Sequence, residues 1–169
     1  MLFRLFLSFF YFCLVTVTAT SSVWAQEDNK GASGFPLPRF ASLQTDEINM
    51  RTGPGTRYPI EWVYVCEGLP VEITAEFDVW RRIRDWEGSE GWIHQNALTG
   101  KRRLIVTGQT RNIYEDPDTA SAVKAHAEPG AIGTLLECQP LWCKVKFDDM
   151  NGYMPKSAFW GTYANETFN

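Results

Sequence analysis

The stretch Asn49-Met-Arg-Thr-Gly-Pro-Gly-Thr56 opens a unit that this chain contains twice. The second copy opens with Asn112-Ile-Tyr-Glu-Asp-Pro-Asp-Thr119, where an asparagine and a proline keep the same spacing. A repeat of about sixty residues is longer than the usual solenoid periods, so it predicts two tandem copies of a small domain, each with its own core. Each copy closes with a tryptophan-led and then a glycine-led stretch: Trp80-Arg-Arg-Ile83 and Gly91-Trp-Ile-His94 in the first, Trp142-Cys-Lys-Val145 and Gly152-Tyr-Met-Pro155 in the second.

Both copies have the composition of β structure. Aromatic and β-branched residues are plentiful, turn signals such as Gly53-Pro-Gly55 recur at short spacing, and no long stretch keeps a helical period. The pattern predicts an all-β chain of short strands folded into two small barrels. Residues 121–127 remain open, because they also fit a short helical turn. Strands are expected at residues 40–43, 48–51, 60–65, 71–77, 80–84 and 90–94, and again at 104–106, 111–114, 135–138, 143–147 and 152–154.

The first copy carries a resemblance to a known family. Asn49-Met-Arg-Thr-Gly-Pro-Gly-Thr56 closely resembles the opening signature of bacterial SH3-like domains, which is roughly Asn-Val-Arg-x-Gly-Pro. Gly68-Leu-Pro-Val-Glu-Ile73, the strand at Trp80 and Gly91-Trp-Ile93 follow in that family's order. The matches cover roughly residues 40–161. They imply two tandem SH3-like β-barrels, similar to the secreted two-repeat proteins of Gram-negative bacteria.

The second copy departs from the signature at its opening, where Tyr114-Glu-Asp116 replaces the arginine, the small residue and the glycine. Its closing Gly152-Tyr-Met-Pro155 also resembles the Gly-Tyr-Ile-Pro of eukaryotic SH3 domains, and Trp142 stands where their ligand-stacking tryptophan would lie. Those domains bind polyproline helices in an aromatic groove. Other groove positions differ in a way that disfavours polyproline recognition: Ala97 and Ala158 stand in place of a tyrosine, and His94 stands in place of a proline.

Residues 1–25 have the pattern of a secretory signal peptide. Arg4 gives a positive start, residues 5–17 are apolar, and Val23-Trp-Ala25 forms a cleavage site. Cleavage is favoured over an uncleaved anchor, because the apolar run is short for a span and no stop-transfer segment follows. We therefore expect a periplasmic or secreted protein that meets the membrane only through this signal. The segments expected after it are a flexible leader at 26–38, domain 1 at 39–100 and domain 2 at 101–165.

Without the signal the chain is acidic. Removal of Arg4 leaves 15 Lys and Arg residues against 20 Asp and Glu, a formal charge of −5. Proteins that bind nucleic acid present a basic patch, so this balance disfavours nucleic acid and other polyanions as default partners. Two basic runs remain. Lys101-Arg-Arg103 fits a solvated connector, and in Arg81-Arg-Ile-Arg84 strand alternation turns the second and fourth residues away from the first and third.

The mature chain would hold three cysteines and two histidines. Cys138-Gln-Pro-Leu-Trp-Cys143 places two cysteines on either side of a short turn, and in an oxidising compartment we expect a disulfide across this hairpin. Cys66 is left over within an apolar strand, where a free buried thiol is the plain expectation. With no Cys-x-x-Cys pair and with His94 far from His126, the sequence predicts neither a metal site nor a cofactor.

A catalytic role would need a nucleophile beside a positioned base. Cys66 with His94 is the pairing that domain 1 offers, and nothing in the sequence brings these two residues together. The adjacent carboxylates of Asp46-Glu47 and of Asp148-Asp149 fit solvated loops, because neighbours on a strand face opposite ways. The chain is therefore expected not to be an enzyme.

A binding role has more support, because domain 1 is rich in large rings. Trp62 and Trp92 are expected in the core, whereas Trp86 lies in a polar turn and Trp80 opens a strand where the family's ligand ring would sit. Exposed rings stack on sugars, prolines or apolar side chains, and two arginines supply cations for a carboxylate such as a peptide terminus. The expected ligand-binding residues are Arg51, Tyr58, Trp80, Arg82, Trp86 and His94.

The resemblance implies a non-catalytic binding module of the bacterial cell envelope, which recognises peptidoglycan peptide stems or an envelope protein. The competing hypothesis is a scaffold that joins proteins and takes no small ligand. A ligand module should present a concave aromatic groove with Trp80 and Trp86 partly exposed, whereas a scaffold should hide these rings between the barrels or present a flat apolar patch. Arg51 also fits a second role, as a brace for the loop at Gly53-Pro54.

Overall fold

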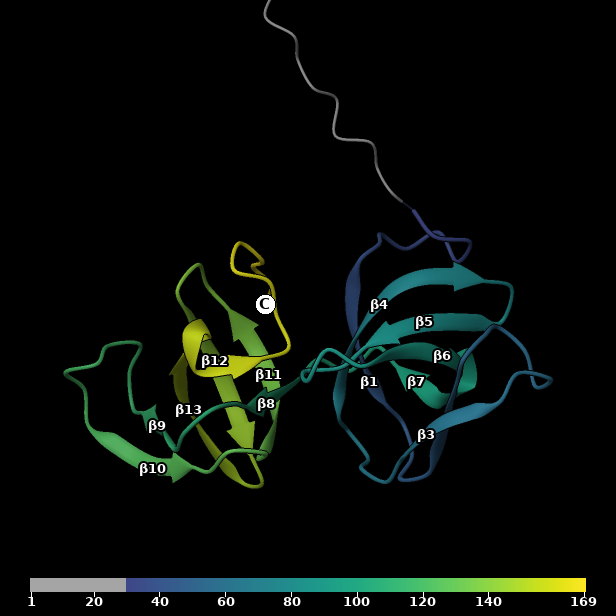
Figure 1. Cartoon of the computed structure of the whole chain (residues 1–169). Helices are drawn as coiled ribbons and strands as arrows, with labels where there is room; N and C mark the ends of the chain where they lie inside the picture. The colour runs from purple at the N-terminus through teal and green to yellow at the C-terminus, as the bar shows by residue number, and fades with distance from the viewer. Residues whose placement is uncertain (1–29) are drawn as a thin grey trace, which may run out of the picture.

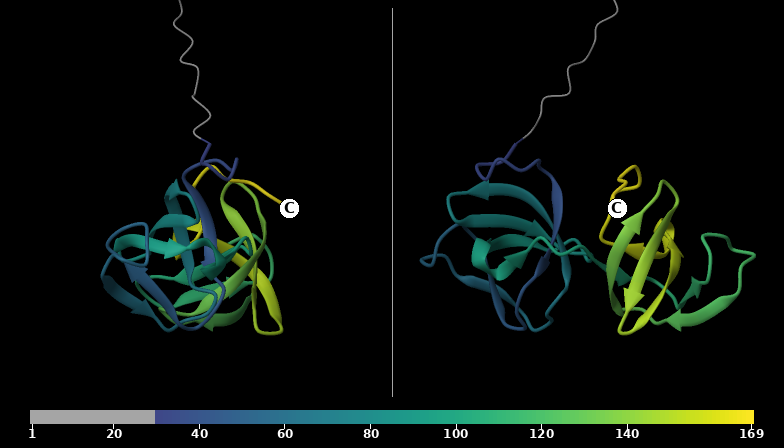
Figure 2. Two further views of the ribbon diagram at one scale, coloured as in Figure 1. Left: turned by 90° about the vertical axis from the view of Figure 1, so that its right-hand side faces the viewer. Right: turned by 180° about the vertical axis from the view of Figure 1, so that it is seen from behind.

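The computed structural model describes residues 30–169, so the predicted signal peptide at 1–25 lies outside the described residues. The described chain forms two lobes that lie side by side, and each is a small barrel of antiparallel strands (Figure 1, Figure 2). The prediction of an all-β chain with two tandem barrels is confirmed. Within residues 30–169, no helix has the length and hydropathy of a membrane span.

The two barrels share one strand order, as their sequence repeat requires. The first consists of β1 (Arg39–Leu43), β2 (Ile48–Arg51), β3 (Ile60–Tyr64), β4 (Pro70–Phe77), β5 (Trp80–Arg84), β6 (Glu90–His94), the 3₁₀ turn η1 (Gln95–Ala97) and β7 (Leu98–Thr99). The second consists of β8 (Arg103–Val106), β9 (Arg111–Tyr114), β10 (Val123–Ala127), β11 (Ile132–Cys138), β12 (Trp142–Phe147), β13 (Met150–Pro155), η2 (Lys156–Ala158) and β14 (Phe159–Trp160). Their orders are β3-β2-β6-β5-β4-β1-β7 and β10-β9-β13-β12-β11-β8-β14.

The segment that the sequence leaves open, residues 121–127, contains a strand and not a helical turn. Val123 pairs with Tyr114 and Ala127 with Arg111, so β10 extends the second sheet beside β9. β10 therefore occupies the place that β3 holds in the first sheet, at the free edge.

Each barrel has its own hydrophobic core. Strand alternation turns Ile83 inward in the first barrel and Val145 inward in the second, and both side chains are fully buried. In β5 the same alternation buries Arg81 and exposes Arg82, as the sequence predicts. The first core also includes Ile105 of β8, a strand of the second sheet, so the two barrels share an apolar contact.

Two tryptophans that we expected in the first core lie elsewhere. Trp62 is 58% exposed, because β3 is an edge strand that pairs only with β2. Trp92 is only partly buried, since its neighbours Gly91 and Ile93 point inward and turn it to the outer face of β6. The prediction for Trp62 was wrong because an apolar run does not reveal which strand lies at the edge of a sheet, and the prediction for Trp92 was wrong because strand alternation turns it outward.

The repeated glycine of the closing motif marks a close crossing of two strands. A Cβ atom on Gly91 would lie 2.5 Å from Cγ of Met50 and 3.0 Å from the carbonyl oxygen of Arg51. In the second barrel, a Cβ on Gly152 would lie 2.8 Å from the carbonyl oxygen of Tyr114. β2 therefore crosses β6, and β9 crosses β13, at a distance that only glycine permits.

Part of the expected flexible leader packs against the first barrel. The backbone N–H and the hydroxyl of Ser33 both donate to the carboxylate of Glu76, each at 2.7 Å. Arg39 and Arg81 approach the same carboxylate to 2.5 and 3.3 Å, and the side chain of Glu76 is fully buried. This carboxylate fixes residues 30–38 to the barrel, a contact that the polar composition of the segment does not reveal.

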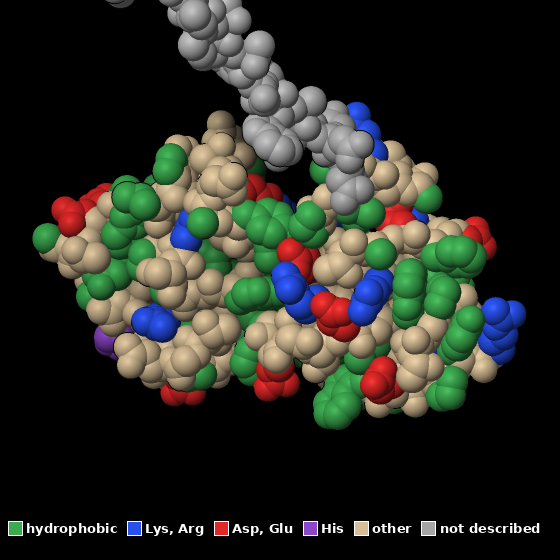
Figure 3. Space-filling model, turned by 45° about the horizontal axis from the view of Figure 1, so that its top comes forward, with side chains coloured by type: hydrophobic (Ala, Val, Ile, Leu, Met, Phe, Trp, Pro, Cys, Tyr) green, Lys and Arg blue, Asp and Glu red, His purple; other side chains and the backbone are tan. Residues whose placement is uncertain are grey.

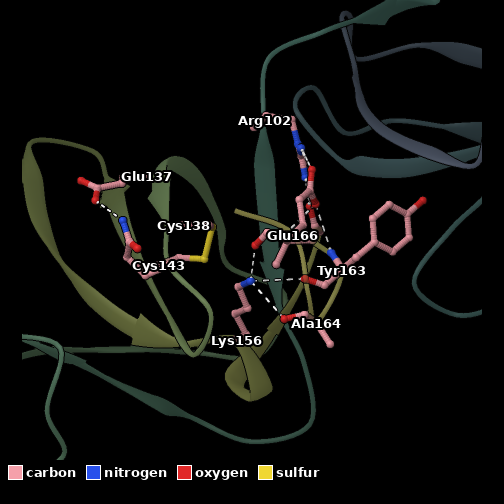
Figure 4. The surroundings of a disulfide bond; sticks show 11 residues. Arg102, Glu137, Cys138, Cys143, Lys156, Tyr163, Ala164 and Glu166 are labelled. Atoms are coloured by element: carbon pink, nitrogen blue, oxygen red, sulfur yellow. Dashed lines mark hydrogen bonds and ion pairs between the residues drawn. A yellow bond between two sulfur atoms is a disulfide. The ribbon is translucent and has the colours of Figure 1, made fainter. Parts of the chain in front are cut away.

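Polar contacts also join the two barrels. Tyr163, in the segment after β14, donates its hydroxyl to Glu72 of β4 at 2.9 Å, and Arg84 pairs with the same carboxylate. Arg102, between β7 and β8, forms an ion pair with Glu166 (Figure 4). The basic connector that we expected to be solvated is therefore partly held by the C-terminal segment.

The predicted hairpin disulfide is present between β11 and β12. Cys138 and Cys143 face each other across the hairpin, with their Cα atoms 4.1 Å apart (Figure 4). Cys66 is a free cysteine and is exposed, so the expectation of a buried thiol was wrong. It follows the edge strand β3, which no further strand covers.

We expect Gly91→Ala to destabilise the protein by about 1–3 kcal/mol, because Met50 and the Arg51 carbonyl must move to admit a methyl group. Gly100→Ala is the matched control, since nothing lies within 4 Å of a Cβ atom at that position. Urea denaturation followed by tryptophan fluorescence gives the free energy of unfolding of each variant. Equal stabilities would contradict the crossing as the reason for this glycine.

Acid should weaken the attachment of the leader. Burial by itself raises the pKa of Glu76, but the hydrogen bonds from Ser33 and the pairing with Arg39 outweigh it and lower the pKa to about 2 from 4.5. A lowered folded pKa means that Glu76 contributes stability above pH 4.5, which is lost as the pH falls toward 2. We therefore expect the stability difference between the native chain and Glu76→Gln to shrink over that interval, measured by urea denaturation. A difference that stays constant would refute this linkage.

Thiol titration checks the disulfide. The secreted chain, denatured without a reductant, should react with a thiol reagent at Cys66 alone, because Cys138 and Cys143 are joined. After reduction, the same titration should also detect the two hairpin thiols. Three free thiols before reduction would show that the hairpin is not cross-linked in the cell.

Candidate functional site

A groove on the first barrel brings together three of the six predicted ligand-binding residues. This cavity of about 410 Å³, which we call groove 1, lies between β2, the end of β6 and η1. Arg51, Trp80 and His94 are the predicted residues that line it. The rest of its lining consists of Thr45, Glu47, Ile48, Asn49, Thr56, Asn96 and Ala97.

Trp80 and His94 form one wall of groove 1, because they lie directly opposite each other on β5 and β6. Their ring centroids are 5.6 Å apart at an interplanar angle of 86°, an edge-to-face arrangement. Trp80 is only 9% exposed, less than the partly exposed ring expected of a ligand module, whereas His94 is half-buried. Nδ1 of His94 accepts a hydrogen bond from the backbone N–H of Asn96 at 3.2 Å, which leaves Nε2 for a ligand.

Arg51 braces a loop and also lines groove 1. Its Nη1 donates to the carbonyl oxygens of Thr56 at 3.2 Å and Tyr58 at 2.8 Å. Tyr58 supports the same loop: a Cβ on Gly53 would lie 2.5 Å from its ring, and the guanidinium of Arg57 stacks 5.0 Å from the ring centroid. Within residues 30–169 Arg51 forms no ion pair with a carboxylate, so its charge is available to a ligand.

Arg82 and Trp86 lie outside groove 1. Arg82 is on the outer face of β5 and pairs with Glu90 at 2.7 Å. Trp86 is 39% exposed in the β5–β6 turn, where the sequence places an exposed ring. The carboxylate of Asp85 holds this turn and accepts the hydroxyl of Tyr64 at 2.9 Å. Burial and this carboxylate raise the pKa of Tyr64, so its hydroxyl remains a proton donor.

The fold does not bring Cys66 and His94 together. The thiol of Cys66 reaches only the carbonyl oxygen of the adjacent Glu67, at 3.9 Å, whereas His94 faces groove 1. The described part of the chain also contains no group of three or more side chains placed to hold a metal ion. What the groove residues supply is stacking, hydrogen bonding and a charge of each sign, from Arg51 and Glu47.

Sequence reasoning missed the polar lining of groove 1. Asn49 faces outward because its neighbours Ile48 and Met50 are buried, so the alternation of β2 could have identified it. Glu47 precedes β2, and Asn96 belongs to η1. Glu47 and Asn96 line the groove because segments distant in the sequence fold together, and no local sequence pattern predicts that contact.

Comparison with known proteins matches both barrels to one family. The family model described as "Bacterial SH3 domain" matches residues 44–100 and 107–161. A Bacillus subtilis (strain 168) protein named "Putative N-acetylmuramoyl-L-alanine amidase YrvJ" is 23% identical over 125 residues, which cover 68% of this chain and 24% of that protein. Structures of NlpC1 and NlpC2 from Trichomonas vaginalis are each 14% identical to this chain, with a TM-score of 0.35. The NlpC1 match covers 77% of this chain and 48% of NlpC1, and the NlpC2 match covers 75% of this chain and 49% of NlpC2. The chain thus spans about a quarter of the first relative and half of the others.

Proposed function

The chain belongs to the bacterial SH3 domain family, and on this premise we propose that it is a non-catalytic binding protein of the bacterial cell envelope. Domains of this family are associated with cell-wall binding. The match with the relative named as an amidase covers only 24% of that relative's length. We therefore propose a binding role for the two barrels, which are what this chain shares with that relative.

We propose peptide stems of peptidoglycan as the ligand, and groove 1 is the observation that carries this assignment. The small exposed part of Trp80 and the ring of His94 fit an apolar or flat group, and the guanidinium of Arg51 fits a carboxylate. Asn49 and Asn96 add amides that suit the polar groups of a peptide. Positive and negative side chains are interspersed over the face of the two barrels that is drawn in Figure 3.

The other three predicted residues have lesser parts in this proposal. Tyr58 supports the loop that Arg51 braces, and so keeps one wall of groove 1 in place. Arg82 lies two strands from Arg51, with Trp92 of β6 between them, so it could contact a ligand that extends beyond the groove. Trp86 is an exposed ring at the end of the same hairpin.

Two observations support a periplasmic or secreted location. The pattern of residues 1–25 is that of a secretory signal, and the Cys138–Cys143 disulfide suits an oxidising compartment. Peptidoglycan, the proposed ligand, also lies outside the cytoplasm. We propose that the mature protein begins after this signal and meets the membrane only during export.

A scaffold role is the second candidate, and one observation favours it. β3 and the residues after it expose four large apolar side chains, and exposed apolar side chains favour contact with another protein. An envelope protein would be the partner there, and groove 1 would then have no ligand. The exposed fractions are 48% for Ile60, 58% for Trp62, 41% for Val63 and 77% for Val65.

Retention on purified, insoluble peptidoglycan tests the proposal. We expect residues 26–169 to sediment with it at moderate salt. Trp80→Phe combined with His94→Ala should weaken binding about tenfold, since removal of one wall of groove 1 costs roughly 1.4 kcal/mol of contact. Co-sedimentation over a range of protein concentrations measures both affinities.

Trp62→Ala is the matched control, because it removes an exposed ring that does not line groove 1. It should bind as the native chain does, and circular dichroism should be the same for all three proteins. Binding that survives the groove variant but is lost with Trp62→Ala would move the site to β3. A native chain that does not sediment even at low salt would reject peptidoglycan as the ligand.

A further inference from the structure

The second barrel has a groove at the position that corresponds to groove 1. It encloses about 240 Å³ between β9, the end of β13 and η2, and we call it groove 2. The repeat aligns Asn112 with Asn49, Tyr114 with Arg51 and Pro155 with His94, so the same places carry different side chains. Groove 2 is lined by Gln109, Thr110, Arg111, Asn112, Tyr114, Pro155, Ser157 and Ala158.

Arg111 is the unusual member of this set. It stands where the first barrel has Ile48, which is 4% exposed, and it lies on the inward side of β9 together with Ile113. A cation therefore stands where the first barrel has a buried apolar side chain, and Arg111 itself is half-buried. Its guanidinium lies beneath the turn at Gly108, where a Cβ atom would come within 3.5 Å of Nη2.

Within the described chain, the guanidinium of Arg111 lacks a strong acceptor. Its Nη2 donates to the carbonyl oxygen of Thr107 at 3.5 Å, and Nε is buried with no hydrogen-bond partner. No ion pair of residues 30–169 includes Arg111, whereas Arg39, Arg81, Arg82, Arg84 and Arg102 each pair with a glutamate. A buried donor without an acceptor is costly, and an anion in the groove would remove that cost.

The rest of groove 2 suits a compact group that is partly apolar. The rings of Tyr114 and Trp142 pack edge to face with centroids 5.6 Å apart, and Trp142 lies opposite Pro155. Asn112 donates to the hydroxyl of Tyr114 at 3.2 Å, so the proton of that hydroxyl can be donated to a ligand. A ring wall beside one cation and a hydroxyl donor matches a carboxylate with a small apolar substituent.

We propose that groove 2 is a binding site for the terminal carboxylate of a short peptide, with Arg111 as its cation. This inference deepens the proposed function and rests on it, because peptide stems carry such carboxylates. Groove 1, with a histidine and an outward arginine, would then bind a different part of the ligand. A single cation in a small cavity fits a monoanion, and the guanidinium can bind a carboxylate through two parallel hydrogen bonds.

NMR titration of residues 26–169 with acetyl-dialanine tests this inference. The free acid should shift the indole N–H of Trp142 and the backbone amides of β9, and the C-terminal amide of the same peptide should bind at least about tenfold more weakly. Arg111→Ile is the decisive variant. It installs the residue that the first barrel has at this position, so it should fold, and it should abolish the shifts at Trp142.

Arg103→Lys, at a cation of β8 that lines neither groove, is the matched control and should leave the shifts at Trp142 unchanged. Equal affinity for acid and amide, or unchanged binding by Arg111→Ile, would overturn the site in groove 2. Peptidoglycan retention separates the two proposals. A chain that is retained on peptidoglycan but does not bind acetyl-dialanine loses only groove 2. A chain that binds acetyl-dialanine at Trp142 but is not retained keeps the carboxylate site and loses the peptidoglycan assignment.

Discussion

The close crossing of β2 over β6 at Gly91 determines which side chains meet at groove 1. Because no side chain separates the two strands, Arg51 pairs directly with β6, and on the other side of β6 the register with β5 sets Trp80 against His94. The crossing at Gly152 has the same consequence for β9 and β13 in the second barrel. A glycine that no ligand needs to touch therefore fixes the geometry of each groove.

The contact between the barrels adds a second constraint, because it relates the two grooves in space. Glu72, with a side chain only 4% exposed, accepts hydrogen bonds from Tyr163 and Arg84. Burial and Glu72 raise the pKa of Tyr163, so its hydroxyl remains a donor. At Glu166 burial by itself raises the pKa, but hydrogen bonds such as that from Arg102 outweigh burial and lower the pKa. Each carboxylate of this contact thus has its donors. A ligand that occupied both grooves would have to match their fixed separation.

The sequence predicted those features that depend on local periodicity. The repeat identified two barrels, alternation identified the inward and outward residues of β5, and the hairpin spacing identified Cys138 with Cys143. It misplaced Trp62 and Cys66, because exposure at a sheet edge depends on strand order. The buried anchor at Glu76 and the union of β2, β6 and η1 in groove 1 also depend on contacts between distant segments, which no local pattern encodes.

The two copies have diverged by moving a cation from one side of a strand to the other. In the first barrel the cation is Arg51, which faces outward beside a buried Ile48, and part of its hydrogen bonding supports the loop after β2. In the second barrel Tyr114 takes the outward place and Arg111 the inward one. The second cation lies in a smaller cavity, and its Nε is buried without a hydrogen-bond partner, which is costly for a donor. The substitutions at positions 111 and 114 weaken the family signature in the second copy, and they also support groove 2 as an anion site. Two unequal grooves suit one ligand with two chemically different parts.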